Sequence, residues 1–273
     1  MYLNNHSYYS LRFGTISEIE LLEIAQQNGC TQLALTDINN TSGCLNFIRK
    51  APEYGIIPIV GVDFRNGAEQ CYVCLAKNND GFLELNKFIS EHVHLKKNFP
   101  DKAPIFTNCF VIYPFEKVLL LDKTTFLDHE YIGIKLTEIH KLRFSKLSGL
   151  TDKLVVLHTV TFRNKRDFNT HRLLRAIDTN MLLSKLPEAQ QGSPDQKMYP
   201  LEIIEKTFED YPYILENTRQ LLSQCSITFN FSKERENQNL KCVFGSLQED
   251  YKTLTALCEL ALPKRYDNVT AII

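Results

Sequence analysis

Residues 31–37 read TQLALTD and residues 56–64 read IIPIVGVDF. Each is a short apolar run with few polar residues, and each carries an aspartate, Asp37 or Asp63, at or near its end. Continuous apolar runs of this length are typical of strands that are buried on both faces. The two stretches therefore predict parallel strands in an α/β fold, with carboxylates near their carboxyl ends.

Helical patterns lie between the predicted strands. The clearest covers residues 17–29, SEIELLEIAQQNG, where Ser17 and Glu20 have capping-box spacing and Gly29 marks the end. The alternation of strand and helix predicts parallel strands, in a barrel or in a doubly wound sheet. Strands are expected at residues 2–6, 31–37, 56–64, 70–78, 109–115, 131–136, 153–162 and 226–231. Helices are expected at residues 17–29, 41–55, 80–93 and 246–266, and two helices broken near Pro212 are expected within residues 201–225.

Polar side chains stand where several of these strands end. They are His6, Asp37, Asp63, Thr159 and Thr161. In (β/α) barrels the active site lies at the carboxyl ends of the strands. We therefore expect these side chains to surround one mouth together with Asn4, although periodicity does not identify the chemistry there.

The composition is that of an ordinary globular protein. Of 273 residues, 44% are hydrophobic, and 31 basic residues stand against 32 acidic ones. This balance lacks the basic field of a duplex-binding domain, so tight DNA binding by the chain alone is not expected. The sequence shows no signal peptide and no apolar run near the ~20 residues that span a bilayer. Eight cysteines scattered through apolar runs are typical of reduced thiols, which favours a cytoplasmic protein.

The later part of the chain has a different character. Residues 184–200 are polar, with three prolines and one glycine, and predict a loop. Residues 233–241, KERENQNLK, predict an exposed charged stretch. Residues 267–273, DNVTAII, begin like a capped helix and then stop, so we expect a longer parent protein.

Several motifs carry a resemblance to a known family. They are HSYYSLRFGT (6–15), LALTDINNTSG (33–43), GIIPIVGVDFRN (55–66), CLAKNNDGFLELNKFIS (74–90), VVLHTVTFRNKRDFNTHRLLRAIDTN (155–180) and FEDYPYILENT (208–218). In order and wording they resemble the PHP (polymerase and histidinol phosphatase) domain at the N-terminus of the catalytic alpha subunit of bacterial DNA polymerase III. The resemblance implies an α/β fold, a distorted (β/α)7 TIM-like barrel with a C-terminal helical extension. It implies a PHP domain at residues 1–240 and the start of a link to the polymerase palm at residues 241–273.

The resemblance also implies a set of metal-ligand positions. In metal-binding members, the barrel mouth holds up to three divalent ions that polarise a phosphoryl oxygen and activate water. The family's His-x-His pair reads Asn4 and His6 here, Asp-His reads Asp37 and Ile38, a glutamate reads Asp63, a histidine reads Cys71, and Asp-x-His reads Thr159 and Thr161. Asparagine is a weak substitute for imidazole, and isoleucine and threonine supply no anionic ligand. We therefore expect a vestigial cleft with no catalytic residue and no metal.

The residues that keep ligand chemistry also have structural interpretations. His6 could be a hydrogen-bonded histidine at a polar mouth. Asp37 could cap the turn that follows it. Asp63 could pair with a nearby base such as Arg65 or stay solvated.

Three functions follow from the resemblance. The first is a non-catalytic scaffold domain of a polymerase alpha subunit, with the remaining polymerase domains as its partners and with DNA and Mg²⁺ bound through those domains. The second is an active phosphoesterase or 3′–5′ exonuclease that uses Zn²⁺ or Mn²⁺. The third is a docking platform for a proofreading exonuclease subunit, which overlaps the first. The residues do not distinguish a main replicase from a damage-tolerant relative.

Overall fold

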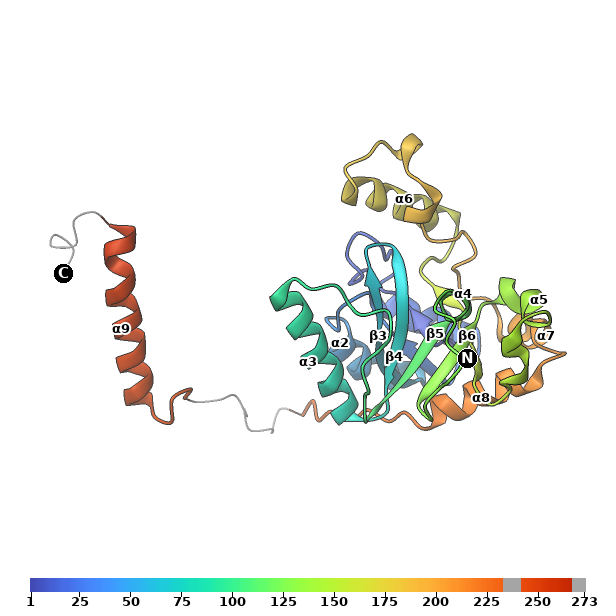
Figure 1. Ribbon diagram of the computed structural model, residues 1–273, viewed down its shortest axis with the longest axis horizontal. Coiled ribbons are helices and arrows are strands. Elements are labelled where there is room, and N and C mark those ends of the chain that lie inside the picture. The colour runs from blue at the N-terminus through green and yellow to red at the C-terminus, as the bar shows by residue number, and fades with distance from the viewer. Residues whose placement is uncertain (233–241, 267–273) are drawn as a thin grey trace. The chain divides into compact units, whose positions relative to one another are not determined.

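The computed structural model describes residues 1–232 and 242–266 (Figure 1). Contacts divide the chain into two units, Met1–Phe229 and Asn230–Ile273. The predicted boundary between residues 240 and 241, the charged stretch 233–241 and the segment 267–273 lie outside the described residues. The boundary stays a prediction.

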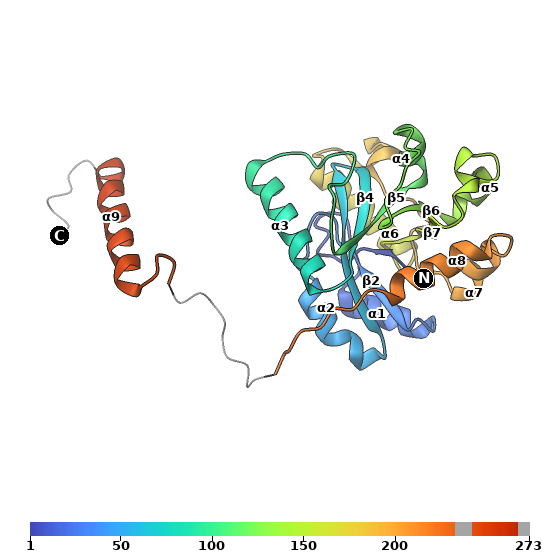
Figure 2. The same cartoon turned by 60° about the horizontal axis from the view of Figure 1, so that its bottom comes forward.

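The first unit is built on a curled six-stranded sheet with the order β2-β3-β4-β5-β6-β7 (Figures 1 and 2). Its strands are β2 (Gln32–Leu35), β3 (Ile57–Asn66), β4 (Glu69–Ala76), β5 (Cys109–Pro114), β6 (Glu130–Ile134) and β7 (Leu154–Val156).

A second, two-stranded sheet pairs β1 (Asn4–Asn5) in parallel with β8 (Thr159–Val160). The Asn5 carbonyl also accepts a hydrogen bond from the Thr36 backbone N–H, at 2.9 Å, just beyond the end of β2. β1 therefore connects β8 to the edge of the large sheet. The predicted α/β class and the distorted TIM-like barrel are confirmed.

The prediction of parallel strands throughout is wrong at β4. β4 pairs antiparallel with both β3 and β5, whereas the β2–β3, β5–β6 and β6–β7 pairs are parallel. Only Gly67 and Ala68 separate β3 from β4, and Gly67 has a φ of 62°. A two-residue connection can join only antiparallel neighbours, and a positive φ is what its tight turn requires.

Two predicted strands also differ from the structure. The strand expected at residues 153–162 is divided into β7 and β8 at Leu157 and His158, and the His158 ring turns to the Lys197 carbonyl, with Nε2 at 2.7 Å. Residues 226–231 form no strand. That segment is held instead by the Ser226 N–H bond to the Lys77 carbonyl, at 2.8 Å, and by side-chain bonds to Asn79.

The first unit also contains α-helices. They are α1 (Glu18–Gln27), α2 (Cys44–Lys50), α3 (Asn79–Leu95), α4 (Phe115–Leu120), α5 (Ile139–Leu142), α6 (Lys165–Asp178), α7 (Leu201–Thr207) and α8 (Pro212–Ser223). The predicted capping box at α1 is present, with Ser17 and Glu20 bonding each other's backbone N–H groups. Figure 1 shows α6 beyond one end of the strands and α8 near the other.

The core has two layers, because successive strand residues point to opposite faces. One face carries Leu3, Ala34, Ile59, Val73, Leu75, Phe110, Ile112, Val155 and Leu157, closed by Leu221 and Leu222 of α8. The opposite face packs against helices, and Figure 2 shows α3 lying beside β4. On β3, Asp63 and Arg65 lie on the same face as Ile59. This strand therefore contributes first to the apolar core and, nearer its end, to a polar cluster.

The second unit contains the predicted C-terminal helix, α9 (Leu247–Arg265), which Ser246 caps through the Glu249 N–H at 3.2 Å. No described residue of α9 is buried, and its exposed apolar side chains include Tyr251, Leu254, Leu257 and Leu260. Among the described residues, no helix has the length and apolar character needed to cross a membrane.

Candidate functional site

His6 and Asp63 form the centre of a fully buried polar cluster at the end of the strands. His6 follows β1, whereas Asp63 lies within β3, and the two meet with Nε2 2.9 Å from Oδ2. The other ring nitrogen, Nδ1, lies 3.0 Å from the Thr161 hydroxyl oxygen. Burial lowers the pKa of His6, although the hydrogen bond to Asp63 opposes this shift. The neutral ring therefore donates Nε2–H to the carboxylate.

Asn4 occupies the neighbouring position and is bound entirely by protein groups. Its Nδ2 donates to the Thr159 hydroxyl at 3.0 Å and to Asp63 Oδ2 at 3.3 Å. Its Oδ1 accepts from the Thr36 hydroxyl at 2.9 Å. The amide therefore serves as a hydrogen-bonding link between three strands.

Arg65 places a guanidinium group on the same carboxylate. Nε and Nη2 donate to Asp63 Oδ2 at 3.0 and 2.7 Å. Burial alone would raise the pKa of Asp63, but the charge of Arg65 and the bond from His6 lower it below the usual range. Asp63 is therefore an ion whose cationic partner is Arg65.

Thr159 and Thr161 complete the cluster with neutral hydroxyl groups. The Thr161 hydroxyl also lies 3.0 Å from Gln196 Oε1, and its backbone N–H donates to the Gln196 carbonyl at 2.8 Å. Gln196 belongs to the stretch 184–200 predicted as a loop, so part of that loop enters the site.

Asp37 is near this cluster but is oriented toward a different turn. Its carboxylate accepts bonds from the Ser7 N–H, the Ser7 hydroxyl and the Ser10 hydroxyl, each at 2.7 Å. The expectation that Asp37 caps the turn that follows it is therefore wrong. Its carboxylate binds the turn that contains Ser7 and Ser10 instead. Burial raises the pKa of Asp37, against these hydrogen bonds.

Ile38 and Cys71 contribute no polar atom to the cluster. Ile38 pairs with Asp63 only through a backbone bridge. Cys71 is the extra residue of a bulge, since Phe64 pairs with Tyr72 and Arg65 with Gln70. Its thiol is buried, its sulfur lies 3.5 Å from the Asn66 amide nitrogen, and burial raises its pKa. Cys71 therefore does not act as a thiolate at the mouth.

These residues do not fit a divalent metal. Within residues 1–232 and 242–266, no three His, Cys, Asp or Glu side chains are close enough to hold an ion. Asp63 Oδ2, the oxygen nearest to His6, already accepts from Arg65. Asp63 Oδ1 has no hydrogen-bond partner among the described residues, but a single carboxylate oxygen is not a coordination site.

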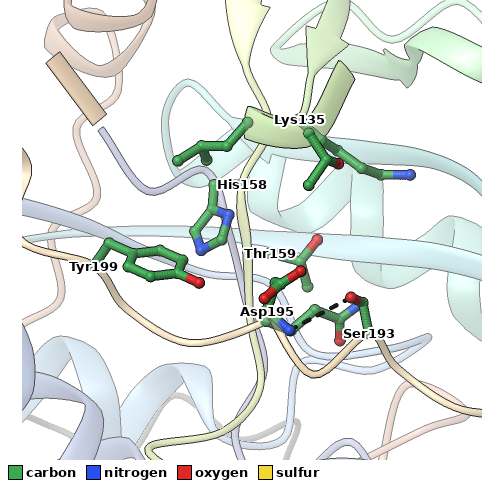
Figure 3. A pocket seen from close by; sticks show the side chains of 9 residues that line it. Lys135, His158, Thr159, Ser193, Asp195 and Tyr199 are labelled. Atoms are coloured by element: carbon green, nitrogen blue, oxygen red, sulfur yellow. Dashed lines mark hydrogen bonds between the residues drawn. The ribbon is translucent and has the colours of Figure 1, made fainter. Parts of the chain in front are cut away.

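A cavity of about 320 Å³ lies beside the cluster (Figure 3). Its lining includes Lys135, His158, Thr159, Ser193, Asp195 and Tyr199. Figure 3 shows the His158 ring between Tyr199 and Thr159, and burial lowers the pKa of His158. The cavity thus has hydrogen-bonding groups, but it contains neither a paired set of carboxylates nor an activated nucleophile.

Reasoning from the sequence anticipated the Asp63–Arg65 pair but missed the hydroxyl of Thr36, the serines on Asp37 and the amide of Gln196. These are polar residues of common type in ordinary turns and strands. Their spacing gives no signal, because only the tertiary fold brings them to the site.

Residues 3–127 match the family model whose description is "PHP domain". This stretch of the chain is therefore similar to a PHP domain. The predicted resemblance to DNA polymerase III alpha subunits is confirmed as well, because curated relatives match across most of the chain. The DNA polymerase III subunit alpha of Escherichia coli K12 is 26% identical over 266 residues, which cover 84% of this chain and 23% of that protein.

Two further relatives have the same description. The Bacillus subtilis protein is 25% identical over 299 residues, covering 97% of this chain and 26% of its own length. The Ureaplasma parvum protein is 40% identical over 88 residues, or 32% of this chain and 9% of its own. The chain thus spans about a quarter or less of the length of the relatives that it matches.

Proposed function

We propose that this PHP domain is the N-terminal part of a DNA polymerase III alpha subunit and supports DNA replication as a structural domain without hydrolytic activity. The similarity to such subunits over 84% and 97% of the chain supports the placement. The observation that carries the structural role is the guanidinium of Arg65 on Asp63, at 2.7 Å, where a metal-dependent enzyme needs a free carboxylate.

The partners of such a domain are the remaining polymerase domains. They supply the nucleotidyl transfer, the bound DNA and the Mg²⁺ on which that transfer depends, and a proofreading exonuclease subunit is a further partner. The exposed apolar residues of α9 support this proposal, since domains of one chain share partly apolar interfaces.

The test compares metal content with hydrolysis. The 273-residue chain is purified without chelator, analysed for bound elements, and assayed on single-stranded DNA and on a phosphate monoester with added Zn²⁺, Mn²⁺ or Mg²⁺. We expect no stoichiometric metal and no hydrolysis above background. Hydrolysis in the presence of Mn²⁺ that disappears in both His6→Ala and Asp63→Asn would establish the alternative, an active phosphoesterase or 3′–5′ exonuclease.

A further inference from the structure

The Arg65 side chain is held inside the protein by three kinds of contact. Only 8% of its side chain is exposed. Two of its nitrogens bind the same Asp63 oxygen, and its guanidinium lies 4.8 Å from the centre of the Phe13 ring. Its backbone N–H and carbonyl are both bound by the Asn39 side chain, at 2.8 and 2.9 Å. A cation fixed at this many points has a defined position.

Among the side chains around Asp63, Arg65 is the cation that neutralises the carboxylate charge. His6 is neutral in this environment, and Asn4, Thr159 and Thr161 carry no charge. Asp37 is satisfied separately by Ser7 and Ser10. An ionised carboxylate without exposure is very unfavourable unless a partner neutralises it.

We propose that Arg65 is a built-in counter-ion, which takes the position of a metal ion at the mouth of this PHP domain and thereby keeps divalent cations out. The site is thus selective for a guanidinium group. This inference rests on the proposed function, because a metal-dependent enzyme would need Asp63 free. It goes further by identifying the group that replaced the metal.

Arg65 also lines a second cavity of about 330 Å³, together with Gln70, Thr159 and Gln196. Truncating the side chain therefore joins the Asp63 carboxylate to space that a small solute can enter. The structure accordingly offers a test by chemical rescue.

The experiment measures the Tm of the full 273-residue Arg65→Ala chain in the presence of EDTA. We expect a loss of about 10 °C, because the change leaves a buried carboxylate unpaired. Millimolar methylguanidinium should restore at least about half of this loss by binding to the folded state. Methylurea, a neutral molecule of the same shape, should restore none.

Arg175→Ala is the matched control. Arg175 is as buried as Arg65, at 7% exposure, and it lies 5.7 Å from the same Phe13 ring. Its ion-pair partner is Asp178, whose side chain is 32% exposed. Methylguanidinium should therefore give Arg175→Ala no specific recovery.

A second comparison covers the case in which Arg65→Ala does not fold. The Arg65→Met variant should be less stable than Arg65→Met combined with Asp63→Asn, because the double variant has no unpaired charge. A double variant that is no more stable than Arg65→Met would overturn the proposal. So would equal recovery with methylurea, or no recovery, in a folded Arg65→Ala chain. Stoichiometric metal in the wild-type chain would defeat the proposed function together with this inference, whereas a failed rescue in metal-free protein would defeat this inference alone, so the two failures are distinguishable.

Discussion

The Phe13 and His171 rings meet edge to face, with centroids 4.5 Å apart, and the Phe13 carbonyl accepts a hydrogen bond from His171 Nδ1 at 2.7 Å. His171 Nε2 in turn accepts the Gly192 N–H at 2.8 Å. One nitrogen donates and the other accepts, so the two contacts match the neutral ring. This histidine joins α6 to the turn after β1 and to the loop that brings Gln196 into the site.

We expect the protein to lose stability as the pH falls from about 6.5 to about 4. Burial lowers the pKa of His171 to about 4, and it also lowers the pKa of His6 and His158. The unfolded chain binds more protons than the folded one in this window, so the stabilisation is complete above pH 6.5 and decreases below it. His171 alone contributes on the order of 3 kcal/mol. Urea unfolding at several pH values measures the slope.

His171→Asn should lower the free energy of unfolding at neutral pH and reduce this pH dependence. His94→Asn is the control, because His94 is exposed near the end of α3. A slope that His171→Asn leaves unchanged would show that other groups control the acid sensitivity.

Chelation should leave the stability of the wild-type chain unchanged. A bound metal would raise the Tm by mass action, and EDTA would reverse that increase. Because Arg65 already neutralises Asp63, we expect the same Tm with EDTA, with Zn²⁺ and with Mn²⁺. A Zn²⁺-dependent rise in Tm that disappears in Asp63→Asn would contradict this expectation.

Removing the cap of α1 should destabilise the protein by about 1 kcal/mol. The Ser17 hydroxyl accepts the Glu20 N–H at 3.1 Å, and Glu20 Oε2 accepts the Ser17 N–H at 2.9 Å. Ser17→Ala removes the first of these bonds. Ser90→Ala, at an exposed position within α3, should change the urea midpoint little. Equal effects of the two substitutions would exclude a specific role of the cap.

Leu257→Asp tests whether the apolar residues of α9 form an interdomain surface. In a longer chain that includes the polymerase domains, we expect reduced primer extension, whereas the Tm of the 273-residue chain should not change. Lys252→Asp is the matched control, since it places the same side chain on the other face of α9 and breaks only an exposed ion pair with Glu249. A fall in the Tm of the 273-residue chain with Leu257→Asp would show that Leu257 packs within this chain and would refute the interface.

Local signals predicted much of the fold. Ser17, Glu20 and Gly29 located α1, and the apolar runs around Leu33 and Ile59 located β2 and β3, because capping and burial depend on neighbours in the sequence. Strand direction at β4 was missed, since the short Gly67 turn outweighed the apparent repeat of strand and helix. The strand expected at residues 226–231 failed because side-chain and backbone contacts with residues 77–79 replaced ladder pairing.

The sequence predicted less of the site than of the fold. Residue types alone showed that Ile38 and Thr161 could not act as charged ligands. The orientation of Asp37 could not be read in this way, because Ser7 and Ser10 lie some thirty positions away in the chain. The role of Gln196 could not be read from the sequence either, because it depends on how a loop of irregular structure folds back onto β8.

The pairing of β1 with β8 has a consequence for synthesis of the protein. Asn4 and Asn5 find their strand partners at Thr159 and Val160, and the His6 N–H binds the Val160 carbonyl at 2.8 Å. During synthesis β1 therefore waits for more than half of these 273 residues before its pairing partner emerges. Such long-range pairing slows folding and leaves apolar segments exposed meanwhile. A nascent chain that has been synthesised only as far as residue 127, where the family match ends, lacks β8, the strand with which β1 pairs.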